Sequence, residues 1–349
     1  MSQEALVREA FSVQSGWCTK LGSPFTARLM DVLGEHLDRQ SATGCKILDW
    51  QGPAGAYGDA VPLRLAGALH ALVRRGRLPQ LAEHYPPNPL PSPISMTNGV
   101  MAAIKDADAE ICEWLDHAPQ TNEVARSAIL YPGLMLIAAE TRLPLALFEL
   151  GASAGLNLIS DKYAYRIGEQ ALGDPTSSVI LSPNWSGSFP TGATPKILSR
   201  RGCDRNPIDV TDRTQRERLL GYVWPDQAER ISRIEAAIEM VGNLKPQIDK
   251  SDAAEWVDDE ISTPAEMGVV RVLYHSISFQ YFPDDTKNRI LSRMEIEGHK
   301  ATPQAPLAWL AFEFHEDQGA RLTLKLWPGG IERVIATADA HGREIQWLK

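Results

Sequence analysis

The sequence predicts an α/β protein: a helical N-terminal region, then a mostly parallel sheet that ends in an antiparallel hairpin. Three observations carry this prediction. Apolar residues before residue 143 recur at helical spacing, residues 143–150 form a wholly strand-like run, and strand-like and helix-like segments alternate after it. We therefore expect a helical region over residues 1–142 and an α/β domain over residues 143–349.

The helical region is predicted from two apolar stripes separated by loops. Glycine and proline clusters at residues 52–55 and 85–93 predict those loops. Pro132 and Gly133 predict a break between two helices, the second of which leads into the first strand. We expect this region to cap the ligand cleft of the α/β domain. The stripes are Leu65, Leu69, Leu72 and Val73, and then Val100, Ile104, Ile111 and Leu115.

The α/β domain is predicted from short apolar or alternating segments. The run from residue 145 to residue 150 is typical of a central parallel strand covered on both faces. Alternation around Pro328 predicts a C-terminal antiparallel hairpin formed by residues 322–327 and 333–337. Between them we expect strands at residues 163–167, 178–181, 196–198, 269–275 and 306–314, and a helix at residues 212–241.

The most informative segment is E-L-G-A-S-A-G-L-N over residues 149–157, directly after the first strand. Gly151 and Gly155 allow backbone to approach a ligand at the start of a following helix, where free N–H groups favour acceptors. The acid and the glycine spacing match a nucleotide or S-adenosylmethionine site in which Ser153 replaces the middle glycine. The dinucleotide fingerprint fails at Ser153 and Leu156.

Residues 151–155 also match the G-x-S-x-G elbow that presents a serine nucleophile. Such an elbow needs several strands and an oxyanion loop before it, whereas the residues before 143 predict helices. Glu149 would moreover be an extra charge beside a serine elbow. The cofactor interpretation is therefore favoured, and a small-residue turn that only packs a helix on a strand remains an alternative.

The composition is that of a globular protein of 349 residues, 44% hydrophobic and 23% charged. Its first residues lack the basic start and apolar run of a signal peptide, and no uncharged stretch reaches membrane-spanning length. The four cysteines form no C-x-x-C pair, which predicts reduced thiols and a cytoplasmic location.

The net charge and the histidine positions limit the classes of binding partner that are expected. A net charge of −9 opposes nucleic-acid binding, because that binding depends on basic residues that displace counterions from phosphates. The eight histidines lack the spacing of a metal site, so no metal is expected. A small molecule is the expected substrate, no membrane partner is expected, and the oligomeric state stays open.

With residues 149–157, Gln120–Glu123, Gly202–Asp209 and His275-Ser276 considered together, the chain resembles a bacterial family of unknown function over nearly its whole length. That family is similar to the S-adenosylmethionine-dependent methyltransferase fold with an added helical N-terminal region. The resemblance supports the fold more than the activity. It implies that the methionine end of the cofactor is held by Glu149, Gly151, Ser153 and Gly155, with Asn157 beside them.

The resemblance also suggests residues for the rest of the cofactor. Asp204 is the candidate acid for the ribose hydroxyls, or it caps the helix after Pro207. Its distance from Gly151 exceeds the roughly twenty-residue step of simple nucleotide folds, which predicts an inserted hairpin within residues 163–195. Asp252 presents a carboxylate to the adenine amino group, or it caps a helix.

His275 and Ser276 follow a predicted strand, at the edge where open α/β sheets place ligands. His275 is the candidate general base, with a structural histidine as the alternative. Ser276 and Asn122 are candidate substrate contacts, and Asn122 is alternatively a helix cap. The favoured function is S-adenosylmethionine-dependent methyl transfer to a small molecule. The alternatives are a non-catalytic nucleoside- or S-adenosylmethionine-binding protein and a serine hydrolase that uses Ser153.

Overall fold

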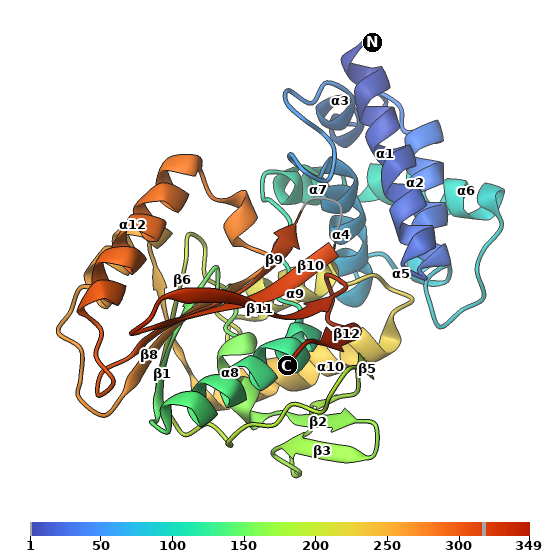
Figure 1. Ribbon diagram of the computed structural model, residues 1–349. Helices are drawn as coiled ribbons and strands as arrows, with labels where there is room; N and C mark the ends of the chain where they lie inside the picture. The colour runs from blue at the N-terminus through green and yellow to red at the C-terminus, as the bar shows by residue number, and fades with distance from the viewer. Residues whose placement is uncertain (1, 316–318) are drawn as a thin grey trace. The chain divides into compact units, whose positions relative to one another are not determined.

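The computed structural model describes residues 2–315 and 319–349 (Figure 1). The chain divides into two compact units. The helical unit comprises the residues up to Thr121 and the segment Thr211–Glu235, and the α/β unit comprises Asn122–Val210 and Ala236–Lys349. The first division lies earlier than residue 142, because the helix before the first strand packs on the sheet and belongs to the α/β unit.

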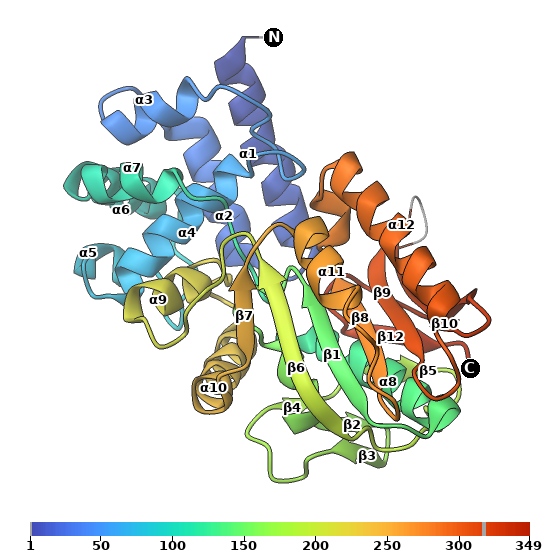
Figure 2. The ribbon, with the colours of Figure 1, turned by 90° about the vertical axis from the view of Figure 1, so that its left-hand side faces the viewer.

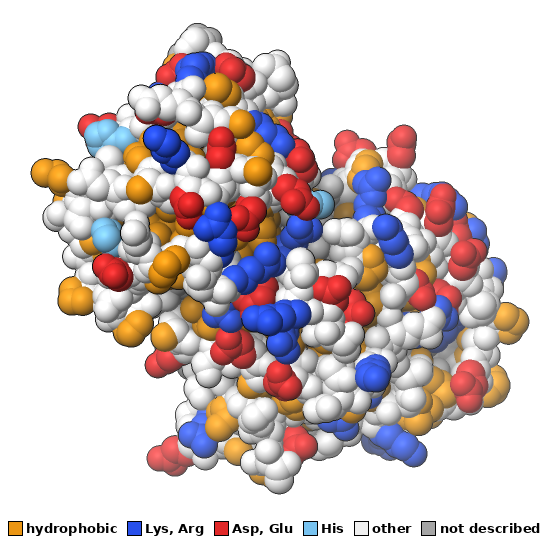
Figure 3. All heavy atoms as spheres, turned by 180° about the vertical axis from the view of Figure 1, so that it is seen from behind, with side chains coloured by type: hydrophobic (Ala, Val, Ile, Leu, Met, Phe, Trp, Pro, Cys, Tyr) orange, Lys and Arg blue, Asp and Glu red, His pale blue; other side chains and the backbone are white. Residues whose placement is uncertain are grey.

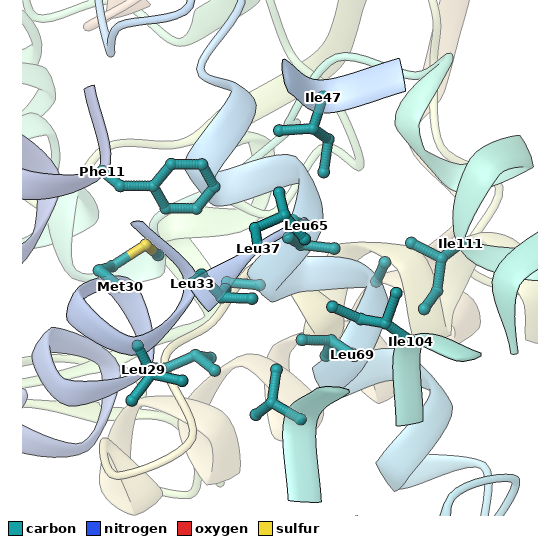
Figure 4. Close-up of a cluster of buried hydrophobic side chains, with 14 of the residues drawn as sticks. Phe11, Leu29, Met30, Leu33, Leu37, Ile47, Leu65, Leu69, Ile104 and Ile111 are labelled. Atoms are coloured by element: carbon teal, nitrogen blue, oxygen red, sulfur yellow. The ribbon is translucent and has the colours of Figure 1, made fainter. Parts of the chain in front are cut away.

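The helical unit encloses its own apolar core. Figure 4 shows side chains from several helices converging there, among them Phe11, Leu33, Leu65 and Ile111. The predicted stripe over residues 100–115 is divided between two helices that meet at Ala107. The helices are α1 (Gln3–Lys20), α2 (Pro24–His36), α3 (Ala42–Leu48), α4 (Val61–Arg74), α5 (Pro79–Ala82), α6 (Pro93–Asp106), α7 (Asp108–Leu115) and α9 (Arg213–Gly221), and α10 (Ala228–Leu244) begins in this unit.

The α/β unit is built on a nine-stranded sheet with the order β5-β12-β11-β10-β9-β8-β1-β6-β7. Adjacent strands in the series β7-β6-β1-β8-β9 are parallel. The strands β9, β10, β11 and β12 form an antiparallel meander. This confirms the mostly parallel sheet and the C-terminal hairpin. The strands are β1 (Leu145–Leu150), β5 (Asn184–Ser186), β6 (Ile197–Asp204), β7 (Gln247–Lys250), β8 (Val270–Ser276), β9 (Leu307–His315), β10 (Gly319–Trp327), β11 (Ile331–Ala338) and β12 (Glu344–Trp347).

The strand order changes direction beside β1. The chain adds β6 and β7 on one side of β1 and then crosses to add β8 and β9 on the other, as Figure 2 shows. This is the arrangement of doubly wound nucleotide-binding sheets, in which ligands bind at the carboxyl ends of the strands near the reversal. The sheet is therefore Rossmann-like, and the edge above β1 is where a site is expected.

Helices cover both faces of the sheet. α8 (Ser127–Thr141) lies against β9, β10 and β11 on one face, while α11 (Ala253–Ile261) and α12 (Asp284–Lys300) lie on the other (Figures 1 and 2). Alternate residues of each strand point to opposite faces. Phe148 accordingly packs on Trp256 of α11, whereas Glu149 faces the α8 side.

The predicted break at Pro132 is wrong, because α8 runs through this proline. A proline inside a helix removes one hydrogen bond. Here tertiary packing compensates, since α8 is buried on nearly all sides and Gly133 lies so close to the sheet that a Cβ atom would stand 2.9 Å from Leu310. The predicted helix over residues 212–241 is instead two helices, α9 and α10, interrupted around Pro225.

A small second sheet is inserted after β1. It contains β2 (Ala164–Ile167), β3 (Gln170–Gly173) and β4 (Ile180–Leu181) in the order β3-β2-β4. β2 and β3 form an antiparallel hairpin, which confirms the insertion predicted within residues 163–195. This hairpin is part of the reason that β6 follows β1 so late in the sequence.

Acidic and basic side chains are intermixed on the surface drawn in Figure 3. Within the part of the chain that the structure describes, no helix has both the length and the apolar character needed to cross a membrane. The same described residues contain no group of three or more histidine, cysteine or acidic side chains arranged to hold a metal ion.

Candidate functional site

The strand register brings the predicted site residues to one edge of the sheet. Leu150 pairs with Cys203 of β6 on one side and with His275 of β8 on the other, so the three strands end together. Asp204 ends β6, and Asp252 follows β7, the next strand outward. Segments far apart in the sequence therefore meet around the turn that follows β1.

The turn after β1 has an unusual backbone. Gly151, Ser153 and Gly155 all have positive φ values, +66°, +52° and +74°. The turn leads into η2 (Asn157–Lys162), a six-residue 3-10 helix with a kink at Ile159. The helix predicted after the turn is thus a short 3-10 helix and not an α-helix, so the turn offers no α-helix terminus for an anion.

Protein groups already occupy much of the space and several of the amides in this turn. A Cβ atom on Gly151 would lie 2.7 Å from the Cβ of Ser278, and one on Gly155 would lie 2.8 Å from Ile248. The N–H of Ser153 donates to Asp204 Oδ2, and the N–H of Leu156 donates to Asn122 Oδ1, each over 2.9 Å. The glycines therefore allow close packing of the turn, which is not an open cradle for phosphate.

Asn122 acts as an anchor for the turn and not as a helix cap. The cap of η1 (Val124–Arg126) is Glu123, whose carboxylate accepts the N–H of Ala125. Asn122 is buried, and its side-chain oxygen is bonded to the turn. The anchoring role of Asn122 could not be predicted from the sequence, because its partner Leu156 is 34 residues away.

The two aspartates serve as backbone acceptors at neighbouring strand ends. Asp204 Oδ1 accepts the N–H of Asn206 over 2.8 Å, in addition to the bond between Asp204 Oδ2 and the glycine turn. Asp252 is the N-cap of α11, where Oδ1 accepts the N–H of Ala254 over 2.9 Å. The capping alternative is thus realised for Asp252, and Asp204 is fixed against the turn.

Glu149 lies beneath the turn and is only 1% exposed. The hydroxyl of Tyr274 is 3.3 Å from both Glu149 Oε2 and the carbonyl oxygen of Asn157. Burial raises the pKa of Glu149 well above its usual value, although the hydrogen bond from Tyr274 opposes this. Burial therefore favours the neutral carboxylic acid.

Asn157 connects the end of the turn to the first residue of α8 and to the segment before that helix. Its side-chain oxygen accepts the hydroxyl of Ser127 over 2.7 Å, and its amide nitrogen donates to the carbonyl of Glu123 over 3.3 Å. Asn157 is 1% exposed, so these bonds satisfy polar atoms that have little access to water. Asn157 holds the turn in place from below.

His275 is buried, with partners for both ring nitrogens. Trp309 Nε1 donates to His275 Nε2 over 3.0 Å, so His275 Nδ1 carries the proton and donates to Glu313 Oε1 over 2.7 Å. The ring also stacks on Phe279 with centroids 4.7 Å apart. No lone pair is left to accept a substrate proton, which favours the structural alternative for this histidine.

Ser276 is buried at the end of β8, and its carbonyl oxygen accepts a bond from Arg126 Nη1 over 3.0 Å. Arg126 Nε also donates to the carbonyl of Ala340, over 3.0 Å, in the connection between β11 and β12. Sequence reasoning missed Arg126, Tyr274, Ser278 and Glu313, since each acquires its partner only when distant strands align.

Ser153 does not have the surroundings of a serine nucleophile. Its Oγ atom is buried and has no hydrogen-bond partner among residues 2–315 and 319–349. A nucleophile elbow requires a base within hydrogen-bond reach of the hydroxyl. The geometry therefore does not support the hydrolase alternative.

An open groove of about 430 Å³ lies at the other end of the nine-stranded sheet, over β5, β11 and β12. Its lining includes Asn184, Thr337, Asp339 and Gln346, and none of the predicted site residues. Asp339 is already engaged by the amides of Arg343 and Glu344. The edge above β1, where the predicted residues meet, therefore remains the candidate site.

The fold and this edge define the protein as a Rossmann-like α/β protein with an added helical unit. The chain belongs to the family described as uncharacterized protein conserved in bacteria (DUF2332), whose pattern matches residues 8–347. This confirms the resemblance to a bacterial family of unknown function. No curated protein and no solved structure matches the chain.

Proposed function

We propose that the α/β unit binds S-adenosylmethionine at the carboxyl edge of β1, β6 and β7, and that the protein transfers its methyl group to a small molecule. The 2.9 Å bond between the Ser153 N–H and Asp204 Oδ2 is the observation that supports this most directly. It joins the turn after the first strand to the acid at the end of the next strand in the sheet. Doubly wound folds bind nucleosides with this pair of features.

The residues at the edge suit the nucleoside part of such a cofactor. Both oxygens of Asp204 accept backbone N–H groups, and a carboxylate, with about four acceptor sites, can bind several donors, among which a ribose hydroxyl would fit. Asp252, after the adjacent strand β7, would accept the adenine amino group with its other oxygen. Bound S-adenosylmethionine would supply an activated methyl group at the switch point above β1.

The occupied amides favour S-adenosylmethionine over a nucleotide that carries phosphates. Phosphate sites in these folds depend on free N–H groups at a glycine-rich turn and a helix terminus. Here two turn amides are bonded to Asp204 and Asn122, and a 3-10 helix replaces the α-helix. A cofactor without phosphates requires neither feature.

The proposal assigns no general base. Alignment of the acceptor with the methyl group and exclusion of water can supply much of the rate enhancement in methyl transfer. His275 retains no free nitrogen, and Glu149 is a buried acid bonded to Tyr274. These observations also favour a second candidate, a protein of the same fold that binds the nucleoside without catalysis.

A panel of ligands tests the proposal by thermal unfolding and calorimetry. S-adenosylhomocysteine at a hundredfold excess over its Kd should add about 2.7 kcal/mol to the free energy of unfolding. S-adenosylmethionine should bind similarly, and ATP should bind more weakly because the turn lacks a phosphate cradle. Absence of any heat or melting shift with the two sulfur compounds at millimolar concentration would refute the proposal.

A further inference from the structure

The loop after β8 contains a strained residue beside the candidate site. Ile277 has φ +49°, a conformation that is rare for a β-branched side chain. Such strain persists only where surrounding contacts hold it, and it is concentrated at functional sites. Ile277 is 8% exposed, and its N–H donates to the carbonyl of Phe312 on β9.

The carboxylate of Glu313 on β9 binds three groups in and beside this loop. Its Oε1 accepts three donors: His275 Nδ1 over 2.7 Å, the N–H of Ser278 over 3.0 Å and the N–H of Phe279 over 3.1 Å. Burial alone would raise the pKa of Glu313, but these hydrogen bonds lower it below its usual value. One carboxylate oxygen thus fixes His275, two positions before Ile277 on β8, and the two residues after Ile277.

The loop in turn fixes the glycine turn. Ser278 Oγ donates to the carbonyl of Leu150 over 3.2 Å, and Ser278 occupies the space beside Gly151. Phe279 is held from the other side, because it stacks on His275 and packs edge-on against Trp309. A displacement of Ser278 would therefore move the backbone at the start of the turn.

We infer that Glu313 is a positioning residue for the candidate site: it holds the strained Ile277–Phe279 loop and thereby sets the glycine turn in its ligand-binding conformation. The effect on the ligand rests on the proposed function. The effect on the loop does not, so the two can be measured separately. His275 takes part as the ring that connects Glu313 to Trp309, and not as a base.

The experiment compares Glu313→Ala with Glu313→Gln, which keeps an acceptor oxygen, and with Glu332→Ala, an exposed glutamate on β11. Hydrogen exchange of the Ser278 and Phe279 amides should accelerate at least about tenfold in Glu313→Ala and remain near the wild-type rate in the other two. S-adenosylhomocysteine affinity should fall about tenfold in the alanine variant alone. If Glu313→Ala does not fold, Glu313→Asp replaces it, because this change withdraws the carboxylate by one methylene.

A double-mutant cycle with Ile277→Gly tests the role of strain. Glycine adopts positive φ without penalty, so Glu313→Ala should accelerate exchange less in the Ile277→Gly background than in the wild type. Equal acceleration in both backgrounds, or unchanged exchange in Glu313→Ala, would overturn the inference. Accelerated exchange with unchanged ligand affinity would also overturn it. Failure of the wild type to bind the ligand would refute the proposed function, and exchange would still decide whether Glu313 holds the loop.

Discussion

At the scale of single residues, burial decides what the carboxyl group of Glu149 can do. The residue appears in the sequence as a charged ligand at the end of a strand, but the structure buries it and raises its pKa. The folded state therefore keeps a proton that the unfolded chain loses above about pH 4.3. The contribution of Glu149 to stability is largest below that pH and decreases as pH rises toward the raised pKa.

Glu149→Gln tests this pH dependence. Glutamine is neutral at every pH and has nearly the same shape, so the variant should lose less stability than the wild type between pH 5 and pH 8. Urea unfolding at several pH values measures the difference. Parallel stability curves for the two proteins would show that Glu149 is not protonated in the folded state.

Ser153 combines two unfavourable features, a left-handed backbone and a buried hydroxyl without a partner in the described chain. Ser153→Gly should therefore raise the free energy of unfolding by about 1–2 kcal/mol. Ser153→Ala removes only the hydroxyl, so it should raise the free energy of unfolding by less than Ser153→Gly does. Arg142→Gly, at another left-handed position that caps α8, relieves backbone strain alone and serves as the control. A loss of stability in Ser153→Gly would mean that the hydroxyl has a stabilising partner.

At the scale of elements, the turn after β1 depends on its contact with the loop after β8. Gly151→Ala adds a Cβ at φ +66° that would stand 2.7 Å from Ser278. Gly168→Ala makes the same change at φ +57° in open space. We expect about 1–2 kcal/mol of destabilisation at residue 168 and at least about 1 kcal/mol more at residue 151. Equal values in chemical unfolding would show that the turn and the loop are not tightly packed.

The strands could be predicted where one local pattern decides the structure. β1 and β8 are mostly apolar and buried at every position because both of their faces are covered, and the C-terminal hairpin alternates because its residues divide between two faces. α8 could not be predicted through Pro132, since only its packing against the sheet compensates for the lost hydrogen bond. The helix after the turn was predicted, but its 3-10 form was not, because distant residues hold that backbone: Asn122 binds Leu156, and Ser127 binds Asn157.

The candidate site could be predicted as a set of strand ends but not as a set of contacts. The resemblance assigned Asp204 and Asp252 to one cofactor, and the structure has both at the ends of neighbouring strands. The partners of His275 could not be predicted, because Trp309 and Glu313 lie more than thirty residues away on β9. A histidine at a strand end indicates a possible base, and only its buried partners indicate a structural role.

At the scale of the whole molecule, the chain forms two units, and each unit is made of two separate stretches of the sequence. The segment Thr211–Glu235 leaves the sheet after β6 and joins the helical unit before the chain returns to β7. A linear division at one residue cannot describe this path. The sheet is nevertheless continuous, because parallel strands tolerate long connections between neighbours.

The central claim is that the edge above β1 binds S-adenosylmethionine through Asp204, and calorimetric titration with S-adenosylhomocysteine tests it most directly. The comparison uses the wild type, Asp204→Asn and Asp174→Asn, because Asp174 also accepts the N–H two residues ahead but lies in the inserted sheet region. Loss of charge-assisted bonds to the ribose should weaken binding roughly 10–100-fold in Asp204→Asn only. No binding to the wild type, or equal affinity in all three proteins, would contradict the claim.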